Sequence, residues 1–162
     1  MRPALLTFLG LFLWFTLAIV TAWYPPLLIV WQLFGVTLLL LALFDVWQVW
    51  RIPPPQVERQ VPGSLPLGVW NEVVLRLHNL SARHCVVEIF DDYPIHSNLH
   101  GLPQLLILPA ATGIETHYRL CPQQRGATQF AGVHLLLHSP WQFWKYYHYL
   151  PLKTAVRVYP NF

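Results

Sequence analysis

The strongest constraint on the fold is a long N-terminal stretch without charge: the sequence has no Asp, Glu, Lys or Arg between Arg2 and Asp45. Of the 162 residues, 55% are apolar and only 10% are charged, whereas an ordinary soluble domain carries about 25% charged residues. This composition excludes an intrinsically disordered chain, which needs low hydrophobicity and high net charge. It also argues against a wholly soluble protein. We therefore expect a membrane segment followed by one small domain.

The uncharged stretch divides into two apolar segments, residues 4–23 and 26–44, each long enough to cross a bilayer. A hydrocarbon core of about 30 Å needs roughly 20 apolar residues in a helix. Pro25 and Pro26 lie between the segments, where prolines can end one helix and begin the next. We predict a two-helix transmembrane hairpin over residues 1–50. A cleaved signal peptide fits less well, because its apolar core is expected to span only about 7–15 residues.

The orientation of the hairpin follows from its positive charges. Arg2, Arg51 and Arg59 all lie on the side that holds both termini, and the turn between the helices has no charge. Positive residues flanking membrane spans favour the cytoplasmic side. We therefore predict that both termini and the domain after the hairpin are cytoplasmic.

After a proline-rich linker at residues 51–56, the apolar period changes from helical to alternating. Residues 72–78 place Val73, Leu75 and Leu77 on one face, and residues 85–90 place Val87 and Ile89 on one face, as strands do. We predict that these two strands form a hairpin through a turn at 79–82. Further candidate strands are 104–108, 116–120, 127–138, 143–149 and 154–159. Short strands at this spacing predict an all-β, immunoglobulin-like antiparallel sandwich over residues 57–162.

Residue types that often carry chemistry are present without a convincing arrangement. His96 and His100 lie near Asp91 and Asp92, but a loop or strand would not bring the two histidines together as a helix would, and the two aspartates favour a turn. Cys85 and Cys121 are expected to be free thiols in a reducing cytoplasm and a disulfide after export. We predict no catalytic site, no metal and no cofactor, and therefore not an enzyme; a metal hydrolase using His96, His100 and Asp92 is a distant alternative.

An aromatic stretch near the C-terminus is the best candidate for an interaction surface. Residues 141–149 include six aromatic residues, more than one face of a single strand can bury. Strand alternation leaves Trp144, Tyr146 and His148 on the face opposite to Phe143. Exposed aromatic rings commonly mark contact surfaces, so we predict that Trp141, Trp144, Tyr146 and His148 contact a partner, a second copy or the membrane surface. The net charge of +3 is too diffuse for nucleic acid, which needs clustered basic residues.

Several short motifs, in this order, resemble the N-terminal half of bacterial domain-of-unknown-function 58 proteins. They are Asn79-Leu80-Ser81, Asp91-Asp92-Tyr93-Pro94, Tyr118-Arg119, Arg125-Gly126, Ser139-Pro140 and Val158-Tyr159-Pro160-Asn161, after two membrane spans. The resemblance covers essentially the whole chain. One departure is local: the family usually has a glycine-containing turn after Ser-Pro, and this chain has Trp141-Gln142-Phe143-Trp144.

The resemblance implies a location in the bacterial inner membrane and, in the family, a von Willebrand A-like domain after the Tyr-Pro-Asn segment. It also implies partnership with a MoxR-type AAA+ ATPase. We therefore predict a membrane-anchored, non-enzymatic adaptor that positions a partner or a von Willebrand A-like domain. The alternative is an exported, membrane-tethered binding domain that faces the periplasm.

Overall fold

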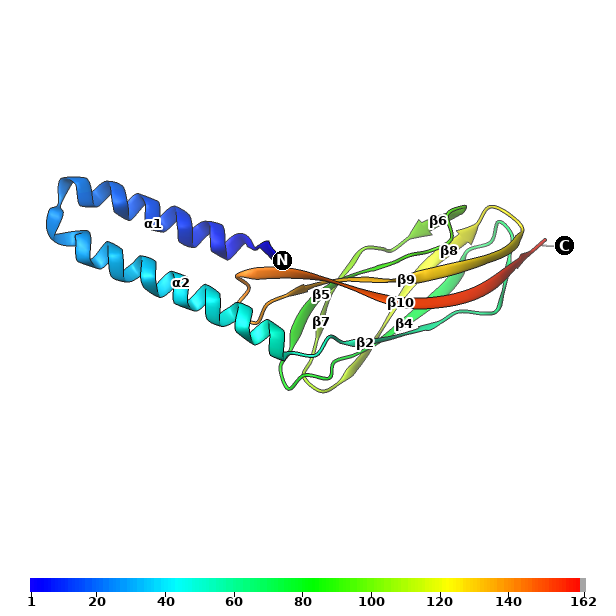
Figure 1. Ribbon diagram of the computed structural model, residues 1–162. Coiled ribbons are helices and arrows are strands. Elements are labelled where there is room, and N and C mark those ends of the chain that lie inside the picture. The colour runs from blue at the N-terminus through cyan, green and yellow to red at the C-terminus, as the bar shows by residue number, and fades with distance from the viewer. Residues whose placement is uncertain (161–162) are drawn as a thin grey trace. The chain divides into compact units, whose positions relative to one another are not determined.

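The structure is a computed structural model that describes residues 1–160 (Figure 1). It divides into two compact units. The first combines Met1–Ile52 with His138–Tyr146, and the second combines Pro53–Leu137 with the chain from Tyr147 onward. A short segment of the predicted 57–162 domain, His138–Tyr146, is thus grouped with the helices. Asn161, the last residue of the family-like motifs, lies outside the described residues.

The predicted helical hairpin is present. Helix α1 spans Leu5–Trp23, a short 3-10 helix η1 spans Pro25–Leu27, and α2 spans Leu28–Arg51. Both helices are long and apolar enough to cross a membrane by length and composition. Helix α2 continues beyond the predicted end at residue 44, because no helix-breaking residue follows until Pro53, which disfavours helical backbone at the residue before it.

The two helices are joined by a reciprocal pair of tryptophans. The Trp14 and Trp31 rings stack with centroids 5.1 Å apart. Each indole N–H donates to the other residue's carbonyl, at 3.3 Å from Trp14 and 3.2 Å from Trp31. Gly35 makes room for this pair, since a Cβ there would lie 2.6 Å from Trp14 Nε1. Small residues at such a crossing allow the close approach that packs membrane helices.

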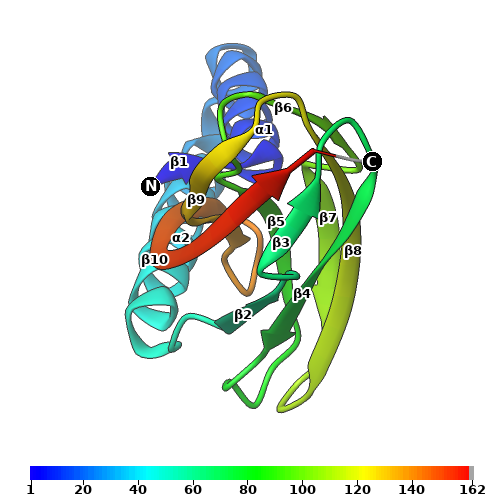
Figure 2. The ribbon, with the colours of Figure 1, turned by 90° about the vertical axis from the view of Figure 1, so that its right-hand side faces the viewer.

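The remaining chain is built from strands. Their bounds are β1 (Arg2–Pro3), β2 (Gln56–Gln60), β3 (Ser64–Pro66), β4 (Asn71–His78), β5 (Cys85–Asp91), β6 (Ser97–His100), β7 (Gln104–Leu108), β8 (Gly113–Pro122), β9 (Gly126–His138) and β10 (Trp144–Tyr159). Sheet A has the order β1-β10-β9-β5-β7, with β3 also paired to β10, and sheet B has the order β2-β4-β8-β6. The predicted all-β, immunoglobulin-like antiparallel sandwich is confirmed, with one parallel pair between β3 and β10. Figure 2 shows β2, β4 and β8 of sheet B together.

The core lies between the two sheets and follows the predicted alternation. Val73, Leu75 and Leu77 of β4 are fully buried, as are Val87 and Ile89 of β5. Sheet B contributes further apolar side chains from β8, and sheet A contributes those of β9, where Val133, Leu135 and Leu137 alternate with half-buried residues. Both assignments of strand faces made from the sequence are confirmed.

The predicted hairpin between residues 72–78 and 85–90 is wrong. Strand β4 pairs with β2 and β8, whereas β5 pairs with β7 and β9. The chain therefore crosses from sheet B to sheet A through residues 79–84. Asn79 fixes this crossing: its buried side-chain amide donates to the carbonyls of Arg83 and Pro109 at 2.8 Å each. An amide that satisfies neighbouring backbone groups can replace the hydrogen bonds of a hairpin turn.

The two strands predicted at 143–149 and 154–159 form one long strand, β10. Pro151 lies within it and has no N–H to donate. On the side of β10 away from β9, β1 pairs at Trp144 and Lys145 and β3 pairs from Arg157 onward. Pro151 therefore lies where no described strand pairs on that side, the position at which a strand tolerates proline.

Candidate functional site

In the helical unit, a buried carboxylate organises the loop between β9 and β10. Asp45 of α2 is fully buried. Its oxygens accept hydrogen bonds from Ser139 Oγ at 2.5 Å, the Trp141 amide at 3.0 Å and the Phe143 amide at 3.2 Å. The only carboxylate among the described residues of α2 thus serves as the anchor of residues 139–143.

Neighbouring contacts hold the same loop against both helices. Trp144 Nε1 donates to the Ala42 carbonyl of α2 at 3.0 Å. The Phe143 carbonyl accepts from the Ala4 amide at 2.8 Å and from Thr7 Oγ1 at 2.5 Å, both at the start of the first helix. The loop at 139–143 is therefore a packed element, with Gln142 at φ +60° as its only residue in the left-handed region among those described.

These contacts place the four predicted interaction residues in different environments. Trp141 is 40% exposed, and its ring lies 5.1 Å from that of Phe44. Trp144 is half-buried against α2, and Tyr146 and His148 are also half-buried. Within the aromatic stretch, the more exposed rings of β10 are those of Tyr147 and Tyr149 on the opposite face, at 58% and 40%. The partner contacts of Trp141, Trp144, Tyr146 and His148 stay a prediction.

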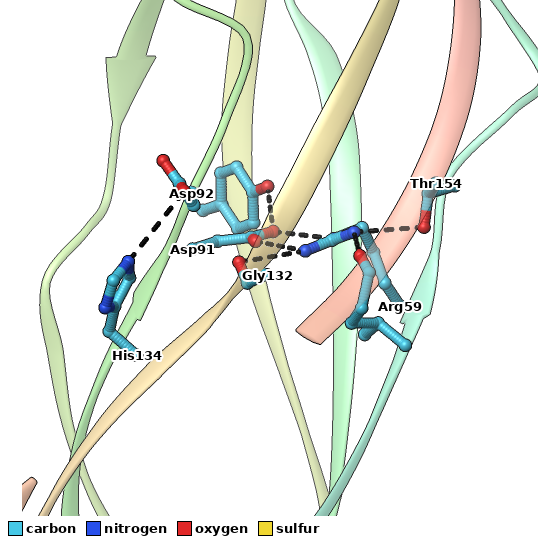
Figure 3. Close-up of polar contacts among 8 residues, drawn as sticks. Arg59, Asp91, Asp92, Gly132, His134 and Thr154 are labelled. Atoms are coloured by element: carbon cyan, nitrogen blue, oxygen red, sulfur yellow. Dashed lines mark hydrogen bonds and ion pairs between the residues drawn. The ribbon is translucent and has the colours of Figure 1, made fainter. Parts of the chain in front are cut away.

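In the second unit, a buried ion pair connects the two sheets (Figure 3). Arg59 of β2 in sheet B forms a bidentate pair with Asp91 of β5 in sheet A, and both side chains are fully buried. The guanidinium also donates to the Leu152 carbonyl at 2.6 Å, Thr154 Oγ1 at 3.0 Å and the Gly132 carbonyl at 3.2 Å. All nitrogens of the guanidinium thus have acceptors, as a buried charge requires.

Tyr118 of β8 completes this cluster from sheet B. Its hydroxyl donates to Asp91 Oδ2 at 2.5 Å. Burial, followed by the negative charge of Asp91 and the hydrogen bond to it, raises the pKa of Tyr118 far above the ordinary tyrosine value, although the Arg59 charge opposes this shift. The phenol therefore stays protonated as a donor. The cluster therefore links the two sheets through three buried side chains.

Asp91 and Asp92 do not form the predicted turn. Asp91 is the last residue of β5 and points into the core. Asp92 points the other way, and its carboxylate lies 3.9 Å from His134 Nε2. The local sequence does not indicate the burial of Asp91, because its partner Arg59 lies 32 residues earlier.

The outer face of sheet A is unusually apolar. We define it by the outward-facing residues of four neighbouring strands: Leu105 and Ile107 of β7, Val86, Glu88 and Phe90 of β5, His134 and Leu136 of β9, and Tyr147 and Tyr149 of β10. Leu105 and Ile107 are 65% and 67% exposed. A sheet face exposed to water normally carries polar residues, so this face has the composition of a contact surface.

An aromatic cluster forms one end of this outer face. The His134 ring lies 4.9 Å from that of Tyr149, 5.6 Å from that of Tyr147 and 6.1 Å from that of Phe90. His134 Nδ1 is hydrogen bonded to the Tyr147 hydroxyl. Gly132 accommodates Tyr149, because a Cβ there would lie 2.5 Å from its hydroxyl. The rings are therefore held in place before any partner binds.

The remaining candidates for chemistry stay apart. Within residues 1–160, no three His, Cys, Asp or Glu residues are grouped as metal ligands. His96 is in the loop after β5, and His100 ends β6. Cys85 begins β5, whereas Cys121 pairs with Asn98 of β6 near the other end of the sandwich. Both thiols are free, and burial raises the pKa of Cys85.

No protein-family model and no curated protein matches the chain. Among solved structures, it is similar to Salmonella alpha-2-macroglobulin reacted with methylamine, at 17% identity and a TM-score of 0.48 over 66% of this chain and 7% of that one. It is also similar to a CARDB domain from Pyrococcus furiosus in complex with di-metal ions, at 12% identity and a TM-score of 0.44. That match covers 67% of this chain and 90% of the other. It is similar as well to a protein of unknown function from Porphyromonas gingivalis, at 17% identity and a TM-score of 0.47. That match covers 68% of this chain and 50% of the other. These values support no functional inference for the chain.

Proposed function

We propose that this chain is a membrane-anchored, non-enzymatic adaptor that binds a protein partner through the outer face of sheet A. The observation that carries the proposal is the exposure of Leu105, Ile107 and Tyr147 on a sheet whose chain begins with two apolar helices. Covering an exposed aliphatic side chain stabilises a complex by about 1.5–3 kcal/mol when burial is complete. The family resemblance suggests a MoxR-type AAA+ ATPase, or a von Willebrand A-like domain, as the partner.

The contact surface differs from the one that strand alternation alone suggested. Trp144 is hydrogen bonded to the helix of its own chain, which accounts for one ring of the aromatic stretch without a partner. Tyr147 and Tyr149 continue the apolar surface of β7 and β5 across β9. A partner that covers this face would bury aromatic rings at one end and aliphatic side chains at the other, the composition typical of an interface core.

The test is direct binding between the full chain in lipid nanodiscs and a purified MoxR-type AAA+ ATPase from the same bacterium. Ile107→Ser and Tyr147→Ser should each weaken binding about 30-fold if these residues are hot spots. Val74→Ser is the matched control, since Val74 is a half-buried apolar residue on the outer face of sheet B. Absence of binding, or an equal loss in all three variants, would refute the proposal.

We further propose that both termini and the β domain are cytoplasmic, on the basis of Arg2 and Arg51 beside an uncharged turn. A fluorescent cytoplasmic reporter fused to the C-terminus should be active, and alkaline phosphatase at the same position should be inactive. Phosphatase activity with no fluorescence would instead support the exported binding domain, whose partner would have to be periplasmic.

A further inference from the structure

A groove of about 680 Å³ lies in the second unit, next to the end of the outer face of sheet A that His134 occupies. The loop Asp92–Ser97 forms one wall, and residues 126–129 of β9 form the other. Pro122, Arg125 and two residues of β10, Ala155 and Val158, also line it. The groove is thus built beside a strand and is not a space within the core.

The strand beside the groove has an unpaired edge. The ladder between β5 and β9 ends where Asp91 lies opposite Val133. Asp92 adds one more connection: its amide donates to the Gly132 carbonyl at 2.9 Å, and its carbonyl accepts from the Ala131 amide at 3.1 Å. From residue 130 back to 126, no backbone hydrogen bond reaches β9 from this side anywhere in residues 1–160.

The loop after β5 leaves this edge open because it turns away toward sheet B. The His96 carbonyl accepts a hydrogen bond from the Gln123 amide at 2.8 Å, and Ser97 then begins β6, which pairs with β8. Ile95 of this loop lines the groove and is 90% exposed. An extended edge with an apolar side chain opposite is what strand addition by a peptide requires.

Charge at the two ends of the groove defines the ligand further. Arg125 lies just before β9, lines the groove and is exposed. It forms no ion pair among the described residues. At the other end the Asp92 carboxylate faces His134. A carboxylate on the ligand is therefore favoured beside Arg125 and disfavoured beside Asp92.

We propose that this groove binds an extended peptide segment that adds to β9 as an antiparallel strand, with a carboxylate facing Arg125. Such a strand takes the direction of β5, so its C-terminal end lies near Gly126 and its N-terminal end near Asp92. The five residues 126–130 span about 16 Å at 3.3 Å per residue, which a segment of five or six residues matches. An apolar side chain of the peptide contacts Ile95.

The probe is a pool of N-acetylated heptapeptides. Their first six positions hold any residue except Cys and Pro, and the seventh is Glu with an amidated C-terminus. The comparison pool is identical except that the seventh residue is Gln. Full-length protein in nanodiscs is incubated with each pool, and retained peptides are identified by mass spectrometry. We expect tenfold or greater enrichment from the Glu pool, lost in Arg125→Ala and kept in Lys153→Ala, a control at an exposed cation outside the groove.

A second measurement tests the added strand itself. An enriched peptide should slow amide hydrogen exchange in residues 126–130 of β9, and the same peptide methylated at alternate backbone nitrogens should bind at least tenfold more weakly. Absence of enrichment from either pool would overturn the proposal. Binding that survives backbone methylation, or that is equal in Arg125→Ala and wild type, would overturn it as well, because neither strand addition nor the carboxylate contact would then be involved.

Discussion

Removing the Asp45 carboxylate should release the loop between β9 and β10. Asp45 satisfies two backbone amides and one hydroxyl in a fully buried position. Each hydrogen bond to a charged group contributes about 1.5–3 kcal/mol, and a buried donor left without an acceptor costs about 1–3 kcal/mol. Because Trp141 is 40% exposed, water can replace part of the loss, so we expect about 3 kcal/mol for Asp45→Ala.

The measurement is amide hydrogen exchange of a peptide covering residues 139–144, with the protein in nanodiscs. A loss of about 3 kcal/mol in local opening corresponds to roughly a hundredfold faster exchange, concentrated at the Trp141 and Phe143 amides. Asp45→Asn keeps one acceptor oxygen and should give a smaller increase. The control is Asp92→Asn, which changes a half-exposed carboxylate in the other unit. Unchanged protection of residues 139–144 in Asp45→Ala would refute this account of the loop.

Three further outcomes follow from the same structure. Arg59→Met and Asp91→Leu should each lower the free energy of unfolding by about 3–5 kcal/mol. The double variant should lose less than the sum, because no unpaired buried charge remains. Additive losses in a denaturant titration would contradict a stabilising ion pair between the sheets. Tyr118 has a raised pKa in the folded state. Its contribution to stability is therefore fully present below about pH 10, the pKa of tyrosine in the unfolded chain, and is lost as pH rises above it. The unfolding midpoint should fall in this alkaline range, and Tyr118→Phe should make the fall less steep. Gly35→Ala should displace Trp14 and lower the thermal unfolding midpoint in detergent, because overpacking costs about 1–3 kcal/mol. Gly63→Ala is the control and should have little effect, since an added Cβ there meets nothing within 4 Å.

The sequence predicted the features that depend on local pattern. A charge-free stretch with two central prolines was sufficient for the helical hairpin, and alternation was sufficient for the buried faces of β4 and β5. The pattern did not determine which strands pair. Residues 72–78 and 85–90 read as a hairpin because they are close in sequence, yet Asn79 sends the chain to the other sheet through hydrogen bonds to residues as distant as Pro109. Pairing of this kind depends on contacts that local periodicity does not contain.

The two polar centres were missed for a related reason. Asp45 was visible as a lone carboxylate at the end of an apolar helix, where burial is costly unless the charge is satisfied. That cost could have signalled a partner, but the donors lie 94–98 residues later. Arg59 is one of the three arginines on which the predicted orientation rests, and the sequence does not indicate that its side chain is fully buried in the folded domain.

The positions of the two cysteines change how the membrane orientation can be determined. Free thiols are expected for a cytoplasmic domain and a disulfide for an exported one. Cys85 is the first residue of β5. Cys121 of β8 lies at the far end of the sandwich, where it pairs with Asn98 of β6. The length of β5 alone separates them by about 20 Å at 3.3 Å per residue, whereas a disulfide needs Cα atoms no more than about 7 Å apart. Two free thiols are therefore expected on either side of the membrane, and only a measurement that reports the compartment itself distinguishes the adaptor from the exported domain.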